Sequence, residues 1–307
     1  MRANIGGHPY DVHMDRGEDK LALLTLLHHI EPAMSRTTIR QEMLAGATAS
    51  EILAGPGLIG RDVEHQISLA LSDLEAWEST GIKVLTPLDD EYPAQLLSVY
   101  DFPLVLFGRG YVQHDHRSAA IVGSRVFSVG GQEFARDLAT GLAEDGITVV
   151  SGLAKGIDGT AHRAALKAGG RTVAIIGNGL DHVYPAEHRA MQQEIVEKGL
   201  VLSQFRPNTR SSRQTFPQRN ITMSAYSAMT VIAEAQEASG TRIQARAAIK
   251  HARPLILTQQ VVSTTTWGKE YASGGYDVVV VASAAEARQA VNEILSRASR
   301  PLQLAGV

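Results

Sequence analysis

The first quarter of the chain has the hydrophobic spacing of helices. Apolar residues recur at helical intervals from residue 21 onward, as at Leu21, Leu24 and Leu27. Such spacing places apolar side chains on one face of a helix. The twenty residues before it are polar and mixed in charge. We therefore predict a polar tail over residues 1–20 and a small helical domain over residues 21–85.

A glycine-containing stretch interrupts this predicted helical domain. Gly57-Leu58-Ile59-Gly60 stands just before one of its helices. The stretch resembles a helix-hairpin-helix, whose backbone amides can bind a nucleic-acid phosphate. A plain turn between two helices explains the same residues, and we favour that interpretation. We describe the domain as SAM-like or helix-hairpin-helix-like.

The pattern changes near residue 119, where short β-branched runs begin to alternate with helical stretches. The predicted strands are Ala119–Val122, Thr148–Val150, Thr172–Ile176, Leu200–Leu202, Met229–Ile232, Leu255–Leu257 and Val278–Val281. The predicted helices include Gln132–Glu144, Ala161–Ala168, Ala186–Glu197, Thr241–Lys250 and Ala284–Ala298. Strict alternation of this kind predicts an α/β fold with a Rossmann-type, mainly parallel sheet that carries helices on both faces. We assign it residues 86–298, with a tail over 299–307.

Composition narrows the class of protein. The 307 residues are 44% hydrophobic and 20% charged, as in an ordinary soluble protein, and none is cysteine. The absence of cysteine excludes disulfides, thiolate zinc sites and a cysteine nucleophile. No apolar stretch has the length of a signal-peptide core or of a membrane span. We therefore expect a cytoplasmic location.

The net charge of −3 is unevenly distributed. Residues 1–114 hold 8 Lys and Arg against 16 Asp and Glu, whereas residues 115–260 hold 17 against 12. Within the basic part, residues 198–233 contain five Lys and Arg, no acid, and three interleaved aromatic residues. Such a segment suits a polyanion. A solvated loop would have the same composition, and charge alone does not decide between them.

In a parallel sheet, ligands bind at the carboxyl ends of the strands. The loop after the first predicted strand runs from Gly123 to Gly131 and contains Ser124, Arg125 and Ser128. A glycine, two hydroxyls, one guanidinium and the free amides of a helix start together form a phosphate cradle. The spacing is not the dinucleotide fingerprint, which requires three glycines as G-x-G-x-x-G.

The loop after the second predicted strand also precedes a helix. Here Gly152 and Gly156 flank Lys155, which could reach the anion held by the first loop. We interpret Asp158 as a helix N-cap that accepts from amides of the first turn. For His162 we expect a buried structural hydrogen bond rather than proton transfer, because the sequence implies no partner acid or nucleophile.

Three later loops add aromatic, amide and acidic side chains. Phe216 stands just before Arg219 and Asn220 at a probable helix start, and an aromatic ring beside a guanidinium suits single-stranded nucleic acid. We expect Glu234 to face the site, where it could orient Arg219. Gly240 and Thr241 open the next helix.

Taken in order, these loops resemble the DprA/Smf family of DNA-processing proteins. The matching motifs are the Asp-Asp-x-Tyr-Pro stretch at 89–93, Gly-Ser-Arg-x-x-Ser-x-x-Gly at 123–131, Ser-Gly-Leu-Ala-Lys-Gly-Ile-Asp at 151–158, Gly-x-Gly-Leu-Asp-x-x-Tyr-Pro at 177–185, Phe-Pro-x-Arg-Asn at 216–220 and Glu-Ala-x-x-x-Ser-Gly-Thr at 234–241. The resemblance implies an extended Rossmann domain. It also implies a homodimer that binds incoming single-stranded DNA, loads the RecA recombinase and supports natural transformation.

The resemblance assigns roles to individual residues. The DNA- and phosphate-binding set that it implies is Gly123, Ser124, Arg125, Ser128, Lys155, Gly156, Phe216, Arg219, Asn220, Gly240 and Thr241. In this set the first loop would hold a backbone phosphate, Lys155 would add a second positive charge, and Arg219 and Asn220 would line the rim. The chain departs from the family pattern at Gln204, Ile221, Gln244 and Thr258.

Two other functions stay open. The pocket could belong to a nucleotide phosphoribohydrolase-like enzyme, although only Ser239-Gly240-Thr241 is comparable with the loop of those enzymes. It could also belong to a nucleotide-binding sensor or defence module that does not load RecA. We predict no catalytic residue, cofactor or metal, and we interpret His114-Asp115-His116 as a polar linker rather than as a set of metal ligands.

Overall fold

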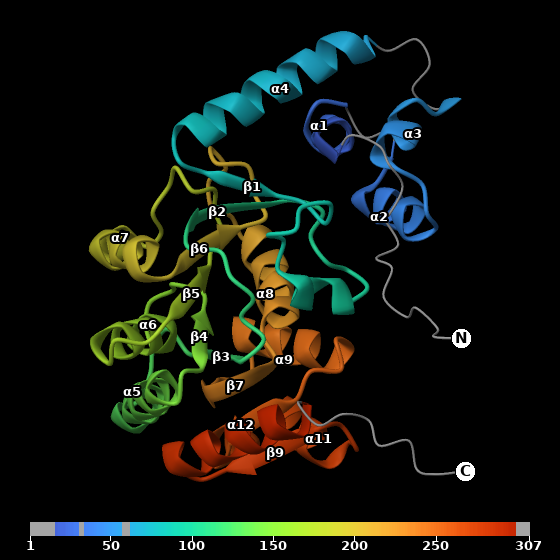
Figure 1. Ribbon diagram of the computed structural model, residues 1–307. Coiled ribbons are helices and arrows are strands. Elements are labelled where there is room, and N and C mark those ends of the chain that lie inside the picture. Colours follow the sequence, from blue (N-terminus) through green and yellow to red (C-terminus); the bar gives the residue numbers. More distant parts are fainter. Residues whose placement is uncertain (1–15, 31–33, 57–61, 299–307) are drawn as a thin grey trace, which may run out of the picture. The chain divides into compact units, whose positions relative to one another are not determined.

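The structure is a computed structural model that describes residues 16–30, 34–56 and 62–298. The contacts within the chain divide it into two compact units. One unit comprises the chain up to residue 92 together with 103–107, and the other comprises 93–102 and the chain from 108 onward. Figure 1 shows the elements of both units. The stretch Gly57–Gly60 lies outside the described residues, and the predicted domain boundaries remain predictions.

The first unit is built mainly from helices. They are α1 (Arg16–His28), α2 (Arg36–Leu44), α3 (Ala49–Leu53) and α4 (Val63–Ser79), followed by the short strand β1 (Lys83–Leu85). Helix α1 thus begins inside the segment predicted as a polar tail. Thr48 and Glu51 form a capping box at the start of α3, which explains why a helix begins there. No helix within the described ranges is long and apolar enough to cross a membrane.

The second unit contains a parallel sheet whose strands match the predicted ones to within two residues. They are β3 (Ser118–Gly123), β4 (Thr148–Ser151), β5 (Thr172–Ile175), β6 (Leu200–Ser203), β7 (Met229–Glu234), β8 (Leu255–Thr258) and β9 (Val278–Val281), in the spatial order β6-β5-β4-β3-β7-β8-β9. The chain leaves β3 in one direction toward β6 and later starts at β7 in the other direction. The boundary between β3 and β7 is therefore the topological switch point, where sheets of this kind bind ligands.

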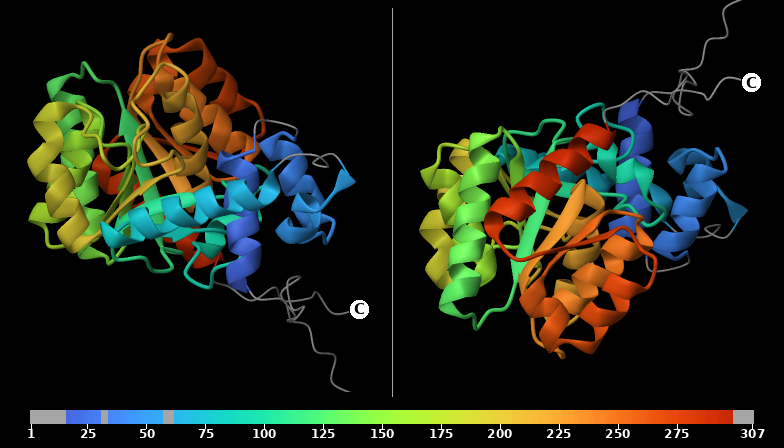
Figure 2. Two further views of the ribbon diagram at one scale, coloured as in Figure 1. Left: turned by 90° about the horizontal axis from the view of Figure 1, so that it is seen from above. Right: turned by 90° about the horizontal axis from the view of Figure 1, so that it is seen from below.

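Both faces of this sheet are covered by helices, and strand β7 shows the division. Val231 packs in one core with side chains from α5 (Val129–Glu144), α6 (Ile157–Lys167) and α12 (Ala284–Ala298). Its neighbour Thr230 accepts a hydrogen bond from Gln244 of α9 (Gly240–Lys250). Successive strand residues point to opposite faces. The predicted α/β, Rossmann-type fold with helices on both faces is confirmed (Figures 1 and 2).

The remaining elements include helices that pack on the sheet, such as α7 on β5 and β6. They are β2 (Leu106–Gly110), the 3-10 helices η2 (Ala94–Ser98) and η3 (Ala186–His188), and the helices α7 (Arg189–Lys198), α8 (Thr215–Tyr226), α10 (Gln259–Thr264) and α11 (Thr266–Ser273). The predicted helix over 186–197 is therefore divided into η3 and α7.

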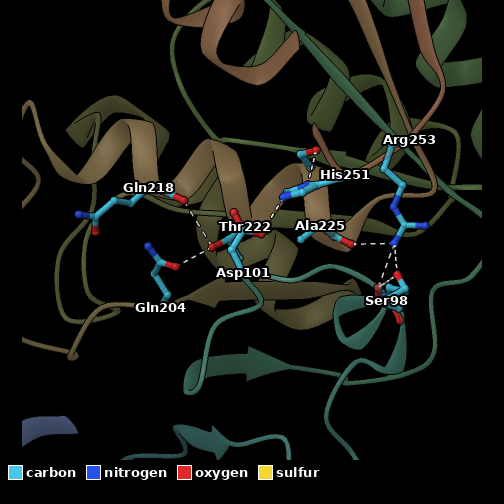
Figure 3. A network of polar contacts seen from close by, with 10 residues as sticks. Ser98, Asp101, Gln204, Gln218, Thr222, Ala225, His251 and Arg253 are labelled. Atoms are coloured by element: carbon cyan, nitrogen blue, oxygen red, sulfur yellow. Dashed lines mark hydrogen bonds and ion pairs between the residues drawn. The ribbon is translucent and has the colours of Figure 1, made fainter. Parts of the chain in front are cut away.

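A polar network joins residues 93–102 to the end of α8 and to the residues that follow α9 (Figure 3). Arg253 Nη2 donates to Ser98 Oγ at 2.7 Å and to the carbonyl of Ala225 at 3.3 Å. His251 lies between Ser224 Oγ at 2.9 Å and Asp101 Oδ1 at 2.8 Å. This order of serine, histidine and aspartate is that of a hydrolase triad. Ser224 is fully buried inside α8, so no substrate reaches it, and the network is structural.

Asp115 corrects one expectation from the sequence. We interpreted residues 114–116 as a polar linker, but Asp115 is buried and accepts hydrogen bonds from Arg171, Tyr226 and Thr148. Burial acts to raise the pKa of Asp115, yet these partners outweigh it and lower the pKa. In the described part of the chain, no three or more His, Asp or Glu residues come together in a group that could hold a metal ion.

Candidate functional site

A pocket of about 450 Å³ lies at the carboxyl ends of β3 and β7. This is the switch point of the sheet, so the strand order alone places a ligand site there. Three loops and the first turns of α8 and α9 surround the pocket. It is lined by Val122, Gly123, Ser124, Arg125, Val126, Ala154, Asp158, Phe216, Arg219, Asn220, Met223, Gln236, Ser239, Gly240, Thr241 and Gln244.

The loop after β3 supplies the mouth of the pocket. Its amide at Ser124 donates to the carbonyl of Glu234 at 2.9 Å, which fixes the loop against the end of β7. Arg125 is exposed, and its guanidinium carbon lies 5.2 Å from the centre of the Phe216 ring. Among the described residues, Arg125 has no hydrogen-bond or ion-pair partner. Its donors are therefore free to bind an anion at the mouth.

Ser128 is predicted to hold a phosphate, but in the structure it is hydrogen-bonded to Glu234. Its amide and its hydroxyl both donate to the Glu234 carboxylate, the hydroxyl at 2.6 Å, and Ser128 Oγ accepts from Gly131 N at 3.0 Å. The expectation that Glu234 orients Arg219 is wrong. Because β7 lies next to β3, the Glu234 carboxylate reaches the amino terminus of α5 and neutralises its dipole.

The loop after β4 supports the first loop more than it lines the pocket. Gly156 has a φ of +87° and begins α6, and a Cβ atom there would overlap the Ser124 carbonyl. Lys155 lies outside the pocket lining and forms an ion pair with Glu187 at 2.7 Å, with both side chains 56% exposed. The two loops thus pack closely. The charge of Lys155 is balanced by Glu187 and is not part of the pocket lining.

Asp158 is not the N-cap that the sequence suggested. Gly156 takes that position, and Asp158 is buried within the first turn, where its Oδ2 accepts from the amide of Gly152 at 3.2 Å. Burial raises the pKa of Asp158, and the positive charge of Arg219 partly offsets this. The carboxylate therefore stabilises the loop and the buried arginine.

Arg219 lies on the floor of the pocket rather than on its rim. It is 5% exposed, and its guanidinium donates to the carbonyls of Gly152 and Ile175 and to Asn220 Oδ1. Burial lowers the pKa of Arg219, and Asp158 opposes that shift. These hydrogen bonds tie the ends of β4 and β5 to α8, so the role of Arg219 is structural.

Asn220 and Phe216 complete this part of the site. Asn220 Nδ2 donates to the Gly240 carbonyl at 3.1 Å, which joins the starts of α8 and α9. Phe216 is half-buried, and its ring centre lies 5.2 Å from the guanidinium carbon of Arg125 and 6.0 Å from that of Arg219. Gly240 and Thr241 line the opposite wall from α9, as the sequence placed them at a helix start.

Tyr184 is an aromatic neighbour of Phe216 that the sequence did not indicate. Tyr184 follows β5 and is 41% exposed, and its ring centre lies 5.4 Å from that of Phe216. Two partly exposed rings side by side offer a surface on which bases can stack. The motif that contains Tyr184 was recognised, but its sequence did not reveal which side chain would stand beside Phe216.

His162 is the buried structural residue that the sequence predicted. Its Nε2 accepts from the Leu153 amide at 3.3 Å, so Nδ1 carries the proton and donates to Thr172 Oγ1 at 2.7 Å. The Thr172 hydroxyl in turn donates a hydrogen bond to the Val149 carbonyl at 2.7 Å. Burial lowers the pKa of His162 to about 3, so the ring is neutral at pH 7.

The fold and the site define a doubly wound α/β protein. Its pocket lies at the switch point of the sheet, with Arg125 at the mouth. The model of the DNA recombination-mediator protein A family matches residues 83–298. The chain therefore belongs to that family, and the resemblance to DprA/Smf proteins is confirmed.

Known proteins of the family differ from the chain in length. Protein Smf of Escherichia coli is 35% identical over 208 residues, which cover 66% of this chain and 56% of Smf. The chain thus spans little more than half the length of this and other curated relatives that it matches.

Two solved structures share the fold. DprA of Streptococcus pneumoniae has a TM-score of 0.66 and 26% identity, with 87% of this chain and 95% of that one covered. DNA processing protein A of Helicobacter pylori, whose single-stranded-DNA binding mode was determined, has a TM-score of 0.61 and 25% identity, with 69% and 96% covered.

Proposed function

We propose that the chain binds single-stranded DNA at this pocket and acts in DNA processing during natural transformation. The observation that carries the proposal is the Arg125 guanidinium, which lies over the ring of Phe216 at the pocket mouth and has no hydrogen-bond or ion-pair partner among the described residues. A backbone phosphate would bind the guanidinium of Arg125. A neighbouring base would stack on Phe216 or Tyr184.

The chemistry of the pocket and the similarity to a DNA-binding protein both support this proposal. Phosphate contacts and stacking on aromatic rings tolerate any base, which suits a protein that must accept any strand. The exposed residues Arg210 and Arg213 follow β6 in the basic segment and would extend the attraction for a polyanion. The relative from Helicobacter pylori binds single-stranded DNA.

We further propose that the chain forms a homodimer and loads RecA on the bound strand. Strand β9 ends the strand order, and its Val280 is 41% exposed beside Tyr276 at 46%. An exposed apolar edge strand is a surface that favours pairing with another copy. Light scattering of the purified chain tests whether it forms a homodimer. RecA filament formation on DNA coated with the chain tests whether it loads RecA.

Fluorescence anisotropy with labelled oligothymidine and its duplex form tests DNA binding directly. We expect tight, salt-sensitive binding that prefers the single strand. Arg125→Ala should weaken binding about tenfold or more and reduce the salt slope by about one phosphate contact. The control is Arg136→Ala, which removes an exposed arginine that pairs with Asp137 on α5. If Arg125→Ala binds as well as the control, the site lies elsewhere.

A nucleotide-sensing role is the second candidate, because the pocket volume also suits a small ligand. Titration with mononucleotides separates the two functions. Binding of a mononucleotide without binding of oligothymidine would favour the sensor, and release of a free base from the nucleotide would favour the hydrolase-like enzyme.

A further inference from the structure

A second cavity, of about 810 Å³, lies beside helix α7. Its lining shares no residue with the pocket at the switch point of the sheet. The walls come from β2, the loop after β5, η3, α7 and β6, and all of their lining residues belong to the second unit. Cavities of this size hold small ligands. The cavity is therefore a candidate for a binding site distinct from that of DNA.

Arg109 of β2 brings to this cavity a guanidinium whose donors are largely unused. Its Nη1 lies 3.5 Å from the Leu180 carbonyl, at the limit of a hydrogen bond, and its Nη2 lies 3.8 Å from Asp181 Oδ1, which is beyond that limit. Its Nε is buried and has no hydrogen-bond partner among the described residues. A guanidinium carries five N–H donors in a planar fork that matches a carboxylate or a phosphate. Arg109 can therefore bind an anion in the cavity.

Two polar side chains of α7 line the same cavity. The guanidinium of Arg189 is exposed and has no hydrogen-bond or ion-pair partner in the described part of the chain. Gln192 is 8% exposed, and its buried Oε1 is also without a hydrogen-bond partner there. Buried polar groups of native proteins are nearly always hydrogen-bonded. Because the torsion of the terminal amide is soft, Gln192 can present either Nε2 or Oε1 to a ligand.

The acids around the cavity limit the charge that a ligand can carry. Glu187 already forms an ion pair with Lys155 at 2.7 Å, whereas Asp181 has only its 3.8 Å contact with Arg109. Asp181 would repel an anion that is bound to Arg109, and the repulsion grows with the charge of that anion. A carboxylate, with one negative charge, therefore fits this site better than a phosphate dianion.

Apolar side chains supply the other walls. They are Leu180 and Val201, which are buried, and Val183 and Val196, which are half-buried. Such walls suit a branched hydrocarbon group, which gains free energy when it leaves water.

We propose that this cavity binds a monocarboxylate with a branched apolar group. Its carboxylate accepts hydrogen bonds from the guanidinium of Arg109 and from the amide of Gln192, and its hydrocarbon part lies against the apolar walls. A free acylated amino acid and the carboxyl-terminal residue of a peptide share this chemistry. The site does not depend on the proposed binding of DNA.

Isothermal titration calorimetry of the full chain with N-acetyl-L-leucine tests the proposal. We expect saturable binding, and no binding of N-acetyl-L-leucinamide, which has the same apolar body without the charge. The peptide acetyl-Gly-Ser-Gly-Leu separates the two sources, since tighter binding of the peptide favours a chain end and equal or weaker binding favours a free amino-acid derivative. The proposal fails if N-acetyl-L-leucine does not bind or if the acid and the amide bind equally.

Variants of the lining locate the carboxylate. Arg109→Met should weaken the binding of N-acetyl-L-leucine about tenfold or more, because it removes charge-assisted hydrogen bonds. Gln192→Leu should weaken it about fivefold, the size expected for one hydrogen bond. The matched control is Arg163→Met, which removes an exposed arginine of α6 that lines a neighbouring cavity. This control should keep the wild-type affinity.

Asp181→Asn gives a test of opposite sign that does not depend on the folding of Arg109→Met. It removes the negative charge beside Arg109, so it should tighten the binding of N-acetyl-L-leucine about two- to threefold. Unchanged or weaker binding would place the carboxylate away from Arg109. Saturating oligothymidine should not displace N-acetyl-L-leucine, and displacement would move the carboxylate to the pocket at the switch point. Failure of oligothymidine to bind would count against the proposed function alone.

Discussion

Two arginines, Arg125 and Arg219, lie close to the ring of Phe216, but they differ in exposure and in hydrogen bonding. Arg125 at the pocket mouth is exposed and unpaired among the described residues, with its guanidinium carbon 5.2 Å from the Phe216 ring centre. Arg219 on the floor lies 6.0 Å from that centre, is 5% exposed and donates to backbone carbonyls. Residue type and motif do not distinguish them. What separates a binding arginine from a structural one is whether its donors are already used.

The largest expected effect is the loss of stability when Arg219 on the pocket floor is replaced. Arg219→Met should lower the free energy of unfolding by about 3–5 kcal/mol, because it leaves Asp158 buried without its counter-charge and frees two carbonyls. Urea denaturation measures this. Arg125→Ala, as the mouth counterpart, should change stability by no more than about 0.5 kcal/mol. A stable Arg219→Met that loses only DNA affinity would show that the floor binds ligand directly.

The stability of the protein should also depend on pH, because the buried His162 is neutral in the folded state. Its pKa is lowered to about 3 in the folded protein, so below about pH 6.5 the unfolded chain binds a proton that the folded one does not. Stability is present above that pH and should fall by about 1 kcal/mol per unit as the pH drops from 6.5 to 5.

Unfolding free energies at several pH values measure this slope. His162→Asn should be less stable at pH 7 and should have a slope shallower by about one proton. The exposed residue His116 provides the control, since His116→Asn should keep the wild-type slope. Equal slopes in the wild type and His162→Asn would mean that the buried ring is not the titrating group. Asp158, whose pKa is raised by burial, contributes to the pH dependence with the opposite sign at acidic pH.

The smallest effect concerns Lys155, which lies outside the pocket lining. Its ammonium pairs with Glu187 at 2.7 Å, so Lys155→Ala should weaken DNA binding by less than about threefold. Glu187→Gln should instead tighten binding slightly, because it releases the lysine. Anisotropy titrations at low salt compare both with Arg125→Ala. A loss from Lys155→Ala as large as that from Arg125→Ala would place Lys155 on the DNA.

The sequence predicted the strands and helices of the second unit closely because their burial is periodic and local. It also located the loops that meet at the pocket, since parallel strands place their carboxyl ends on one edge. It failed where a side chain meets a partner far along the chain. Glu234 reaches Ser128 across 106 positions, and Asp115 reaches Tyr226 across 111. Neither pairing leaves a local pattern in the sequence.

The order of strands explains those failures. The chain runs outward from β3 to β6 and then restarts at β7 on the other side of β3. This reversal brings the Glu234 carboxylate to the start of α5, so a residue expected to serve the pocket stabilises a helix instead. It also sets Gln244 of α9 in the pocket wall, although nothing in its local sequence distinguishes it from a core amide.

The amino-acid sequence by itself determined the α/β architecture, the family and the set of loops that surround the site. Those features depend on the spacing of apolar residues and on short motifs, which are local. The tertiary structure decided which polar groups of those loops remain available to a ligand. That depends on which donors and acceptors the fold satisfies. Within the described part of the chain, Arg125 and Gln244 Oε1 have no hydrogen-bond partner, whereas Ser128, Asp158 and Arg219 are hydrogen-bonded.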